Sequence, residues 1–414
     1  METQQFETLK WVKIALINFV VLALVGVILR YKINFPLPLI DQKFLLHGHS
    51  HFAFVGWVTI ALMSLMVDYL SRQNISVNFK RYRVTLIANM VTAYAMLFTF
   101  MVQGYAFLSI TFSTLSIFVS YFFIYQYWQD LKKVNDRSYA RVWFKTALIL
   151  WAVSSIGAFT LAYLMATHIK VQDYFFAAIY FFLHFQYNGW FVFTCLGLLC
   201  SVKTNYSPTL QKINKKLFLI LIITVIPTYL LSILWLRVPT YLYWIGTISG
   251  VLQLAAILYL ISIFKFMKNS GLYTFSKTTQ YLWLLALSCF VLKIILQGLS
   301  TIPYLSSLAF GFRPIVIAYL HLCFLGVISF FIVGFFNQIM PDQQKLNLTG
   351  AKLFISGVLL QELILMIQGL EMTGVNLLSH SNIILFLIAI MICVGLGQIA
   401  FNIRTEKPVK KNLL

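Results

Sequence analysis

The chain has 414 residues, of which 60% are hydrophobic and only 10% are charged, and its mean hydropathy is +0.85. A soluble domain is nearer half apolar and a quarter charged, so this composition excludes a water-soluble fold. The net charge of +20 does not indicate nucleic-acid binding, because the basic residues lie in short clusters between long apolar runs.

Apolar runs long enough to cross a bilayer define the predicted elements. A helix needs about 20 apolar residues to cross a hydrocarbon core of about 30 Å. In chain order, such runs predict twelve transmembrane helices at residues 11–29, 44–69, 84–104, 107–128, 144–166, 174–200, 216–236, 240–266, 279–301, 314–338, 350–370 and 382–402. The division between the third and fourth runs depends on a turn at Gln103 and Gly104. We therefore expect an all-α polytopic membrane protein with one integral membrane domain over residues 1–414 and no soluble domain.

The distribution of lysine and arginine tests this count, because the cytoplasmic loops of membrane proteins carry an excess of both. With twelve spans, 24 of the 31 basic residues fall on one side, six fall on the other, and Lys293 alone lies inside a span. An error of one helix would scramble this alternation. The pattern therefore predicts that both termini are cytoplasmic.

Five of the seven histidines fall in three even-numbered spans. His47, His49 and His51 open the second span in LLHGHSHFAFVGW, His184 lies in the sixth in YFFLHFQYNGWF, and His321 lies in the tenth in VIAYLHLCFLGV. Even-numbered spans run inward from the outer side, so the rise per residue places all five about 5 to 15 Å below the outer boundary. Ionisable side chains at this depth are costly unless they are paired or bind a ligand. Their common depth predicts a common site.

Imidazole is a usual ligand for haem iron and for copper. On a helix, His47 and His51 are four residues apart and face nearly the same way, whereas His49 points to the opposite side. The triplet can therefore serve two directions. Hydrogen-bonded packing is the alternative role, above all for His184.

These features resemble subunit I of the haem-copper oxidases, and the segment HGHSHFAFVGW is similar to the opening of the NnrS family of twelve-span haem- and copper-containing proteins associated with nitric oxide tolerance. The resemblance implies a haem, expected to be b-type, held between His321 and one of His47, His49 or His51. It also implies copper binding at His184, with Tyr187 nearby. The implied setting is the bacterial cytoplasmic (inner) membrane, with a cytochrome, a quinol or other respiratory subunits as partners.

The chain also departs from the oxidase pattern. The seventh span, LFLILIITVIPTYLLSILWL, lacks the expected histidine pair, Cys323 stands where span ten would carry a second histidine, and Tyr187 is one residue too close to His184. We therefore expect a haem protein for electron transfer or for handling nitric oxide or oxygen, without a complete binuclear copper site. Whether it is an oxidoreductase-like enzyme is left open.

Two further ionisable residues are expected near the middle of the membrane, Lys293 in the ninth span and Glu362 in the eleventh. They indicate a proton or substrate path, or else a structural ion pair or a neutralised lysine. Asparagine and glutamine within spans, such as Asn89, Gln186 and Asn188, are expected to form hydrogen bonds between helices.

Two other functional hypotheses follow from the same residues. The first is a metal or small-molecule transporter that uses HGHSH as an outer-side metal site and couples protons through Lys293 and Glu362. Its weakness is that the sequence shows no internal repeat. The second is an assembly or interaction subunit that has kept an oxidase topology and lost the chemistry.

Overall fold

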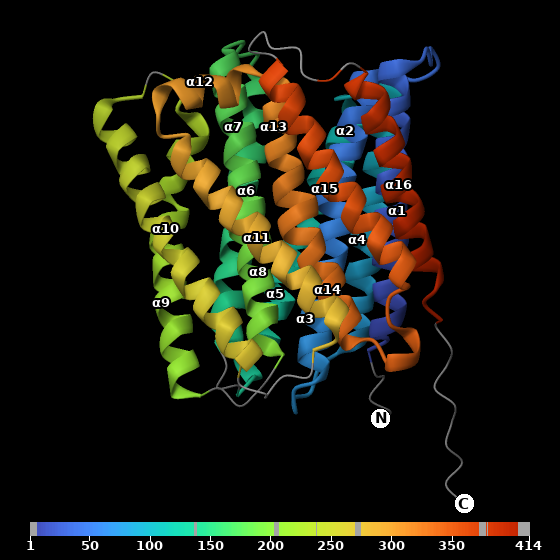
Figure 1. Cartoon of the computed structure of the whole chain (residues 1–414), viewed down its shortest axis with the longest axis vertical. Helices are drawn as coiled ribbons and strands as arrows, with labels where there is room; N and C mark the ends of the chain where they lie inside the picture. The colour runs from blue at the N-terminus through green and yellow to red at the C-terminus, as the bar shows by residue number, and fades with distance from the viewer. Residues whose placement is uncertain are drawn as a thin grey trace, which may run out of the picture.

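The computed structural model describes residues 6–135, 139–202, 207–236, 238–269, 275–371, 378 and 380–404. Within these ranges all regular elements are helices and none is a strand. The long helices run side by side in one bundle, and α1 begins at the same end at which α16 finishes (Figure 1). The predicted all-α class is confirmed.

The first half of the chain contains α1 (Thr8–Asn34), α2 (Gln42–Phe52), η1 (Ala53–Thr59), α3 (Ile60–Ser71), α4 (Phe79–Gln103), α5 (Phe107–Lys133) and α6 (Ala140–Ala166). The middle contains α7 (Gln172–His184), η2 (Phe185–Phe191), α8 (Val192–Ser201), α9 (Pro208–Val225), η3 (Pro227–Ile233) and α10 (Thr240–Asn269). The last part contains α11 (Lys277–Leu299), α12 (Pro303–Gly311), α13 (Arg313–His321), η4 (Leu322–Ser329), α14 (Phe330–Ile339), η5 (Asp342–Gln344), α15 (Leu348–Glu371) and α16 (Ser381–Phe401).

The described residues form ten helices that are long and apolar enough to cross a membrane, or eleven if the bent pair α9 and η3 is one span. The bend of 48° lies next to Pro227, whose ring and missing N–H interrupt a helix. The remaining predicted span corresponds to Gln172–Ser201, where α7, η2 and α8 follow one another without a break. His184, Gln186 and Asn188 reduce the hydropathy of this segment, so its crossing stays a prediction.

The outer faces of the bundle carry large apolar side chains. Phe107 is 80% exposed, Leu258 68% and Leu363 55%. A soluble protein rarely exposes so many large apolar groups side by side. This surface is compatible with a lipid bilayer.

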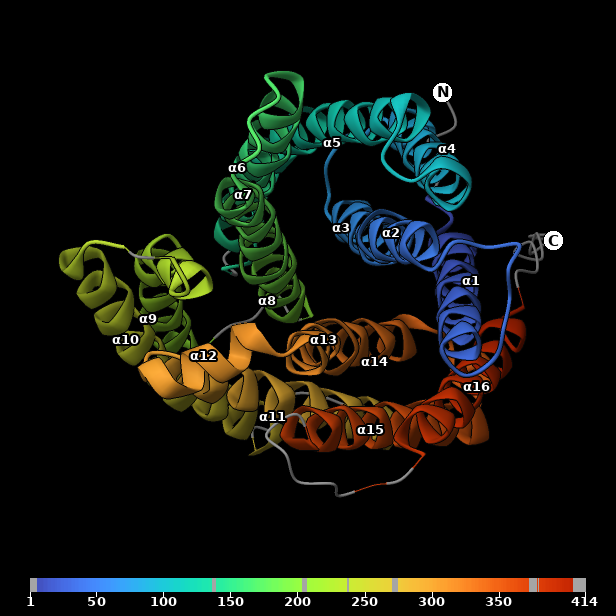
Figure 2. The same ribbon diagram turned by 90° about the horizontal axis from the view of Figure 1, so that it is seen from above.

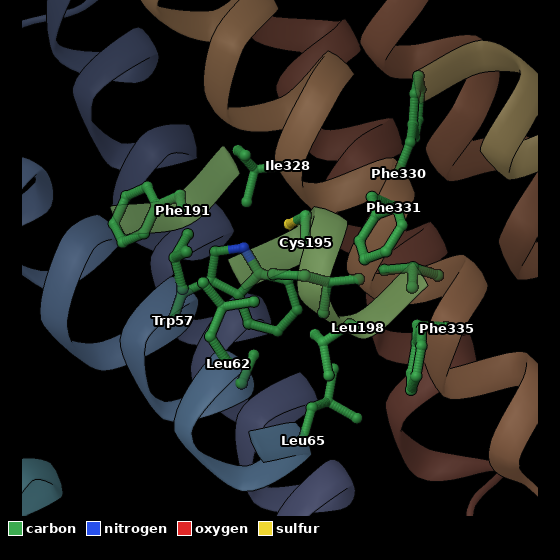
Figure 3. Packing of buried hydrophobic residues seen from close by; sticks show 14 of the residues in the cluster. Trp57, Leu62, Leu65, Phe191, Cys195, Leu198, Ile328, Phe330, Phe331 and Phe335 are labelled. Atoms are coloured by element: carbon green, nitrogen blue, oxygen red, sulfur yellow. The ribbon is translucent and has the colours of Figure 1, made fainter. Parts of the chain in front are cut away.

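Figure 2 shows the bundle from above, with α2–α3 enclosed by an arc of α4, α5 and α6, and with α13–α14 lying against α11 and α15. The three histidine-bearing spans pack through fully buried side chains such as Trp57 of η1, Leu198 of α8 and Phe330 of α14 (Figure 3). The three histidine-bearing segments therefore meet in the interior of the molecule.

Candidate functional site

Each of the three histidine-bearing spans changes from α-helix to π-helix just after its histidine. The π segment η1 begins two residues after His51, η2 begins directly after His184, and η4 begins directly after His321. Each π segment also contains a glycine in its middle. Single π turns are rare and occur frequently at functional sites. Three of them at matching positions mark this layer as the candidate site.

A π turn disturbs the regular hydrogen-bond ladder, and asparagine side chains compensate for this in η1. Asn18 of α1 donates to the carbonyl of Gly56 at 2.7 Å, and Asn89 of α4 donates to the carbonyl of Val55 at 3.0 Å. In the hydrocarbon core of a bilayer, a backbone carbonyl without a hydrogen-bond partner would cost roughly several kcal/mol. The predicted role of Asn89 in bonding between helices is confirmed.

One phenylalanine from each π segment joins the three spans. The ring of Phe54 lies 4.6 Å from that of Phe324 and 5.8 Å from that of Phe191, and the last two rings are 5.8 Å apart. We call Phe54, Phe191 and Phe324 the phenylalanine triad. Because its three members touch pairwise, the histidines above it belong to helices that converge.

His49 packs against α1 beside Gly26 and comes within electrostatic range of His321. His49 lies eight residues before Trp57 and His321 eight residues before Ser329, and Trp57 Nε1 donates to Ser329 Oγ at 2.9 Å. Equal spacing from this bond places the two histidines at one level. Their imidazoles are near enough to interact electrostatically, and Arg30 of α1 lies near both.

The two imidazoles also share a pattern of partners. His321 Nδ1 donates to the carbonyl of Ile317 at 2.8 Å, and His49 faces the backbone carbonyl of Leu22. The other nitrogen of His49, Nδ1, is buried without a partner. A metal-ligating histidine commonly donates one N–H to a backbone carbonyl and keeps the other nitrogen for the metal.

His47 and His51 point to the opposite side of α2, as predicted. His51 stacks on Phe100 of α4 at 4.3 Å, and its Nε2 lies 3.1 Å from the hydroxyl of Tyr105. The His47 ring packs edge-on against Tyr105 at 4.7 Å. The histidines of the HGHSH triplet therefore lie in two separate environments, with His49 on one side of α2 and His47 and His51 on the other.

His184 is buried and uses both ring nitrogens within the protein. Its Nε2 donates to the carbonyl of Val225 at the end of α9 at 2.7 Å, and its Nδ1 accepts from the Asn188 amide at 3.0 Å. Copper binding would require the Asn188 amide to move away from Nδ1. The assignment of His184 and Tyr187 to a metal stays a prediction.

A buried polar series continues from Asn188. The phenol of Tyr187 interacts with Asn188 and with Tyr319 of α13, and Tyr319 interacts in turn with the thiol of Cys323. Lys293, only 2% exposed, donates to Gln297 of its own helix at 2.5 Å and lies near Cys323. The carboxyl oxygen Oε1 of Glu362 is buried without a partner.

An ion pair between Lys293 and Glu362, one of the alternatives that the sequence left open, is not seen among the described residues. Both groups are nevertheless near Cys323, so the series runs from α7 through α13 to α11 and α15.

Sequence reasoning did not find three participants. Arg30 lies just after the first predicted span, Tyr105 lies between the third and fourth, and the Trp57–Ser329 bond joins residues 272 positions apart. The turn at Gly104 was a usable signal for Tyr105, because it returns the chain toward the outer end of α2.

In the described part of the chain, no group of three or more His, Cys, Asp or Glu side chains is arranged to hold a metal ion. No protein-family model matches the sequence, and no curated protein is significantly similar to it. The class that fold and composition define is a multi-pass α-helical membrane protein, and any finer assignment has to come from the site.

Proposed function

We propose that this chain is a haem-binding membrane protein that acts in electron transfer or in handling nitric oxide or oxygen. The observation that supports this best is the pair of His49 and His321. They stand at one level on the second and tenth spans, within electrostatic range of each other, and each has one ring nitrogen directed at a backbone carbonyl. Of the three histidines in the second span, His49 is therefore the proposed partner of His321.

The residues around this pair suit a porphyrin. His49 Nδ1 is an orphaned buried nitrogen, which is the state expected of a ligand seen without its metal. A haem carries two carboxylates, and Arg30 is a cation near both histidines. The phenylalanine triad lies further along the same spans and would give a porphyrin an apolar boundary on that side. The sequence has no C-x-x-C-H motif for covalent attachment, which agrees with a b-type haem.

In this proposal His49 and His321 hold the iron, and the carbonyls of Leu22 and Ile317 orient their rings. When bound, a bis-histidine haem supplies one-electron chemistry, with a reduction potential set by its axial ligands and by burial. A cytochrome or a quinol within the membrane is the proposed source of electrons. The oxidase and NnrS resemblance stays part of this proposal.

A complete binuclear copper centre is not part of the proposal. His184 has both nitrogens engaged, and in the described residues of α9 and η3 no histidine stands nearby to share a copper ion. The Tyr319–Cys323 contact occupies the position where a second haem ligand would be needed.

The proposed topology is twelve spans with both termini in the cytoplasm of a bacterial inner membrane. The alternation of basic residues supports it, and so does the position of the start of α1 and the finish of α16 at one end of the bundle (Figure 1). Reporter-enzyme fusions after residues 104 and 202 should report opposite sides of the membrane. The same reporter activity at both positions would contradict the topology.

A visible spectrum of the full-length protein purified in mild detergent tests the haem. We expect a Soret band, α and β bands in the reduced-minus-oxidised difference, and one haem per chain. His49→Ala and His321→Ala should each abolish or shift these bands. His47→Ala is the matched control, because this residue lies on the same helix but faces Tyr105.

Two results would overturn the proposal. One is a protein that contains no porphyrin after expression with adequate haem supply. The other is an unchanged spectrum in both His49→Ala and His321→Ala, since haem would then be held elsewhere.

A further inference from the structure

The half of the HGHSH triplet that faces away from His321 is not used by the proposed haem site. His47 and His51 lie within the regular α-helix α2, four residues apart. Side chains at this spacing have Cβ atoms about 5–6 Å apart, which lets two imidazoles reach one ion. The two rings are close enough to interact electrostatically, and both contact Tyr105.

Tyr105 is placed over this pair by an unusual turn. Gly104 has a positive φ of 62°, and a Cβ there would lie 2.4 Å from the Phe44 ring. Only glycine fits both the conformation and the space. The turn between α4 and α5 thereby brings the Tyr105 phenol onto the side of α2 that carries His47 and His51.

The spacing of the polar atoms suits a coordination shell. Two donors that bind one ion at about 2.0–2.1 Å stand about 3 Å apart, and His51 Nε2 lies 3.1 Å from the Tyr105 oxygen. Among the described residues, neither ring nitrogen of His47 has a hydrogen-bond partner, so whichever nitrogen is unprotonated is free to bind.

The surroundings allow a cation to arrive from the outer side. Tyr105 is 43% exposed, and His47 and His51 are partly exposed. The charged groups near His47 are Lys43 and Asp41, which have opposite signs. The Asp41 carboxylate already accepts from the backbone N–H groups of Lys43 and Phe44 at the start of α2, so it is not counted as a ligand.

We propose that His47, His51 and Tyr105 form an outer-side binding site for one divalent transition-metal ion, Cu²⁺ or Zn²⁺. Imidazole suits both ions, and the Tyr105 oxygen adds a third donor once its hydrogen bond with His51 Nε2 is broken and the phenol proton is released to water. Water completes the shell. This site does not depend on the haem, because its ligands face the other side of α2.

Equilibrium dialysis of chelator-treated full-length protein in detergent against Zn²⁺, and separately against Cu²⁺, tests the site. We expect about one ion per chain in the wild type, and binding at least about tenfold weaker in His47→Gln and His51→Gln. Tyr105→Phe should weaken binding less, because two imidazoles remain. His168→Asn, at an outer turn, is the control and should bind as the wild type does.

Additional measurements separate this proposal from misfolding and from the haem. His47→Gln removes no hydrogen bond, so elution from a sizing column should match that of the wild type. The Cu²⁺ electron paramagnetic resonance spectrum should show coupling to nitrogen that His47→Gln reduces. His321→Ala should leave metal binding intact. Binding that is unchanged in the double variant His47→Gln/His51→Gln, or a wild type that binds neither ion, would overturn the site.

Discussion

Ser329 accepts the indole N–H of Trp57 at 2.9 Å and donates its own hydroxyl to the carbonyl of Phe324 at 2.8 Å. One serine thus links the second and tenth spans and at the same time satisfies a carbonyl of the π segment η4. His49 and His321 each lie eight residues before one partner of the Trp57–Ser329 bond, so this bond sets the relative height of the two proposed haem ligands.

Replacing Ser329 with alanine should destabilise the protein. The change leaves Trp57 Nε1 buried without an acceptor, which costs about 1–3 kcal/mol. The thermal midpoint in detergent should fall, and the haem bands should weaken with it. Ser262→Ala is the matched control, since Ser262 is exposed on α10 and bonds only to a carbonyl of its own helix. Equal midpoints for the two variants would show that the Trp57–Ser329 bond contributes nothing.

Gly104→Ala should lower both stability and metal binding. The backbone conformation of Gly104 (φ 62°, ψ −141°) alone costs an alanine about 1–3 kcal/mol, and the contact with Phe44 adds to this. Tyr105 should shift, so Zn²⁺ affinity should fall more than for Tyr105→Phe. Gly397→Ala on α16 is the control, because a Cβ there meets open space. A Gly104→Ala protein with wild-type stability would contradict the strained turn.

The periodicity of apolar and basic residues was sufficient for the all-α class and for most helix boundaries. Helix geometry predicted that His49 faces away from His47 and His51, because it alone sets the directions of residues two and four positions apart. Those features depend on local sequence, which is why they could be predicted.

The π segments and the contacts between spans could not be predicted in the same way. A π turn results from the balance between backbone and tertiary packing, and the carbonyls it disturbs are satisfied by distant residues such as Asn18 and Asn89. The choice of His49 as the partner of His321 needed the third dimension, since it depends on which helix each ring faces. The bond between Asn188 and His184 is local. That it competes with a metal follows only from the structure, because Val225 already occupies the other ring nitrogen of His184.

Glu362→Gln should leave stability unchanged or raise it. The Glu362 oxygen Oε1 is buried without a partner, and an amide removes the burden of a buried ionisable group while keeping the shape. We expect a thermal midpoint equal to or above that of the wild type. A large drop would mean that the carboxyl group has a structural partner. A stable variant that loses redox-linked proton uptake would instead favour the proton-path interpretation.

His184 provides the sharpest test between a structural and a metal role. Its Nε2 bond to Val225 joins α7 to α9, so His184→Ala should destabilise the protein by about 2–4 kcal/mol through the lost bonds and the cavity. If His184 is only structural, copper content measured on the purified protein will be the same in the wild type and in Asn188→Ala. If Nδ1 binds copper, Asn188→Ala should increase copper content, because it removes the amide that competes for the lone pair. Since Asn188→Ala leaves the Val225 bond intact, its copper content separates the two roles even if His184→Ala fails to fold.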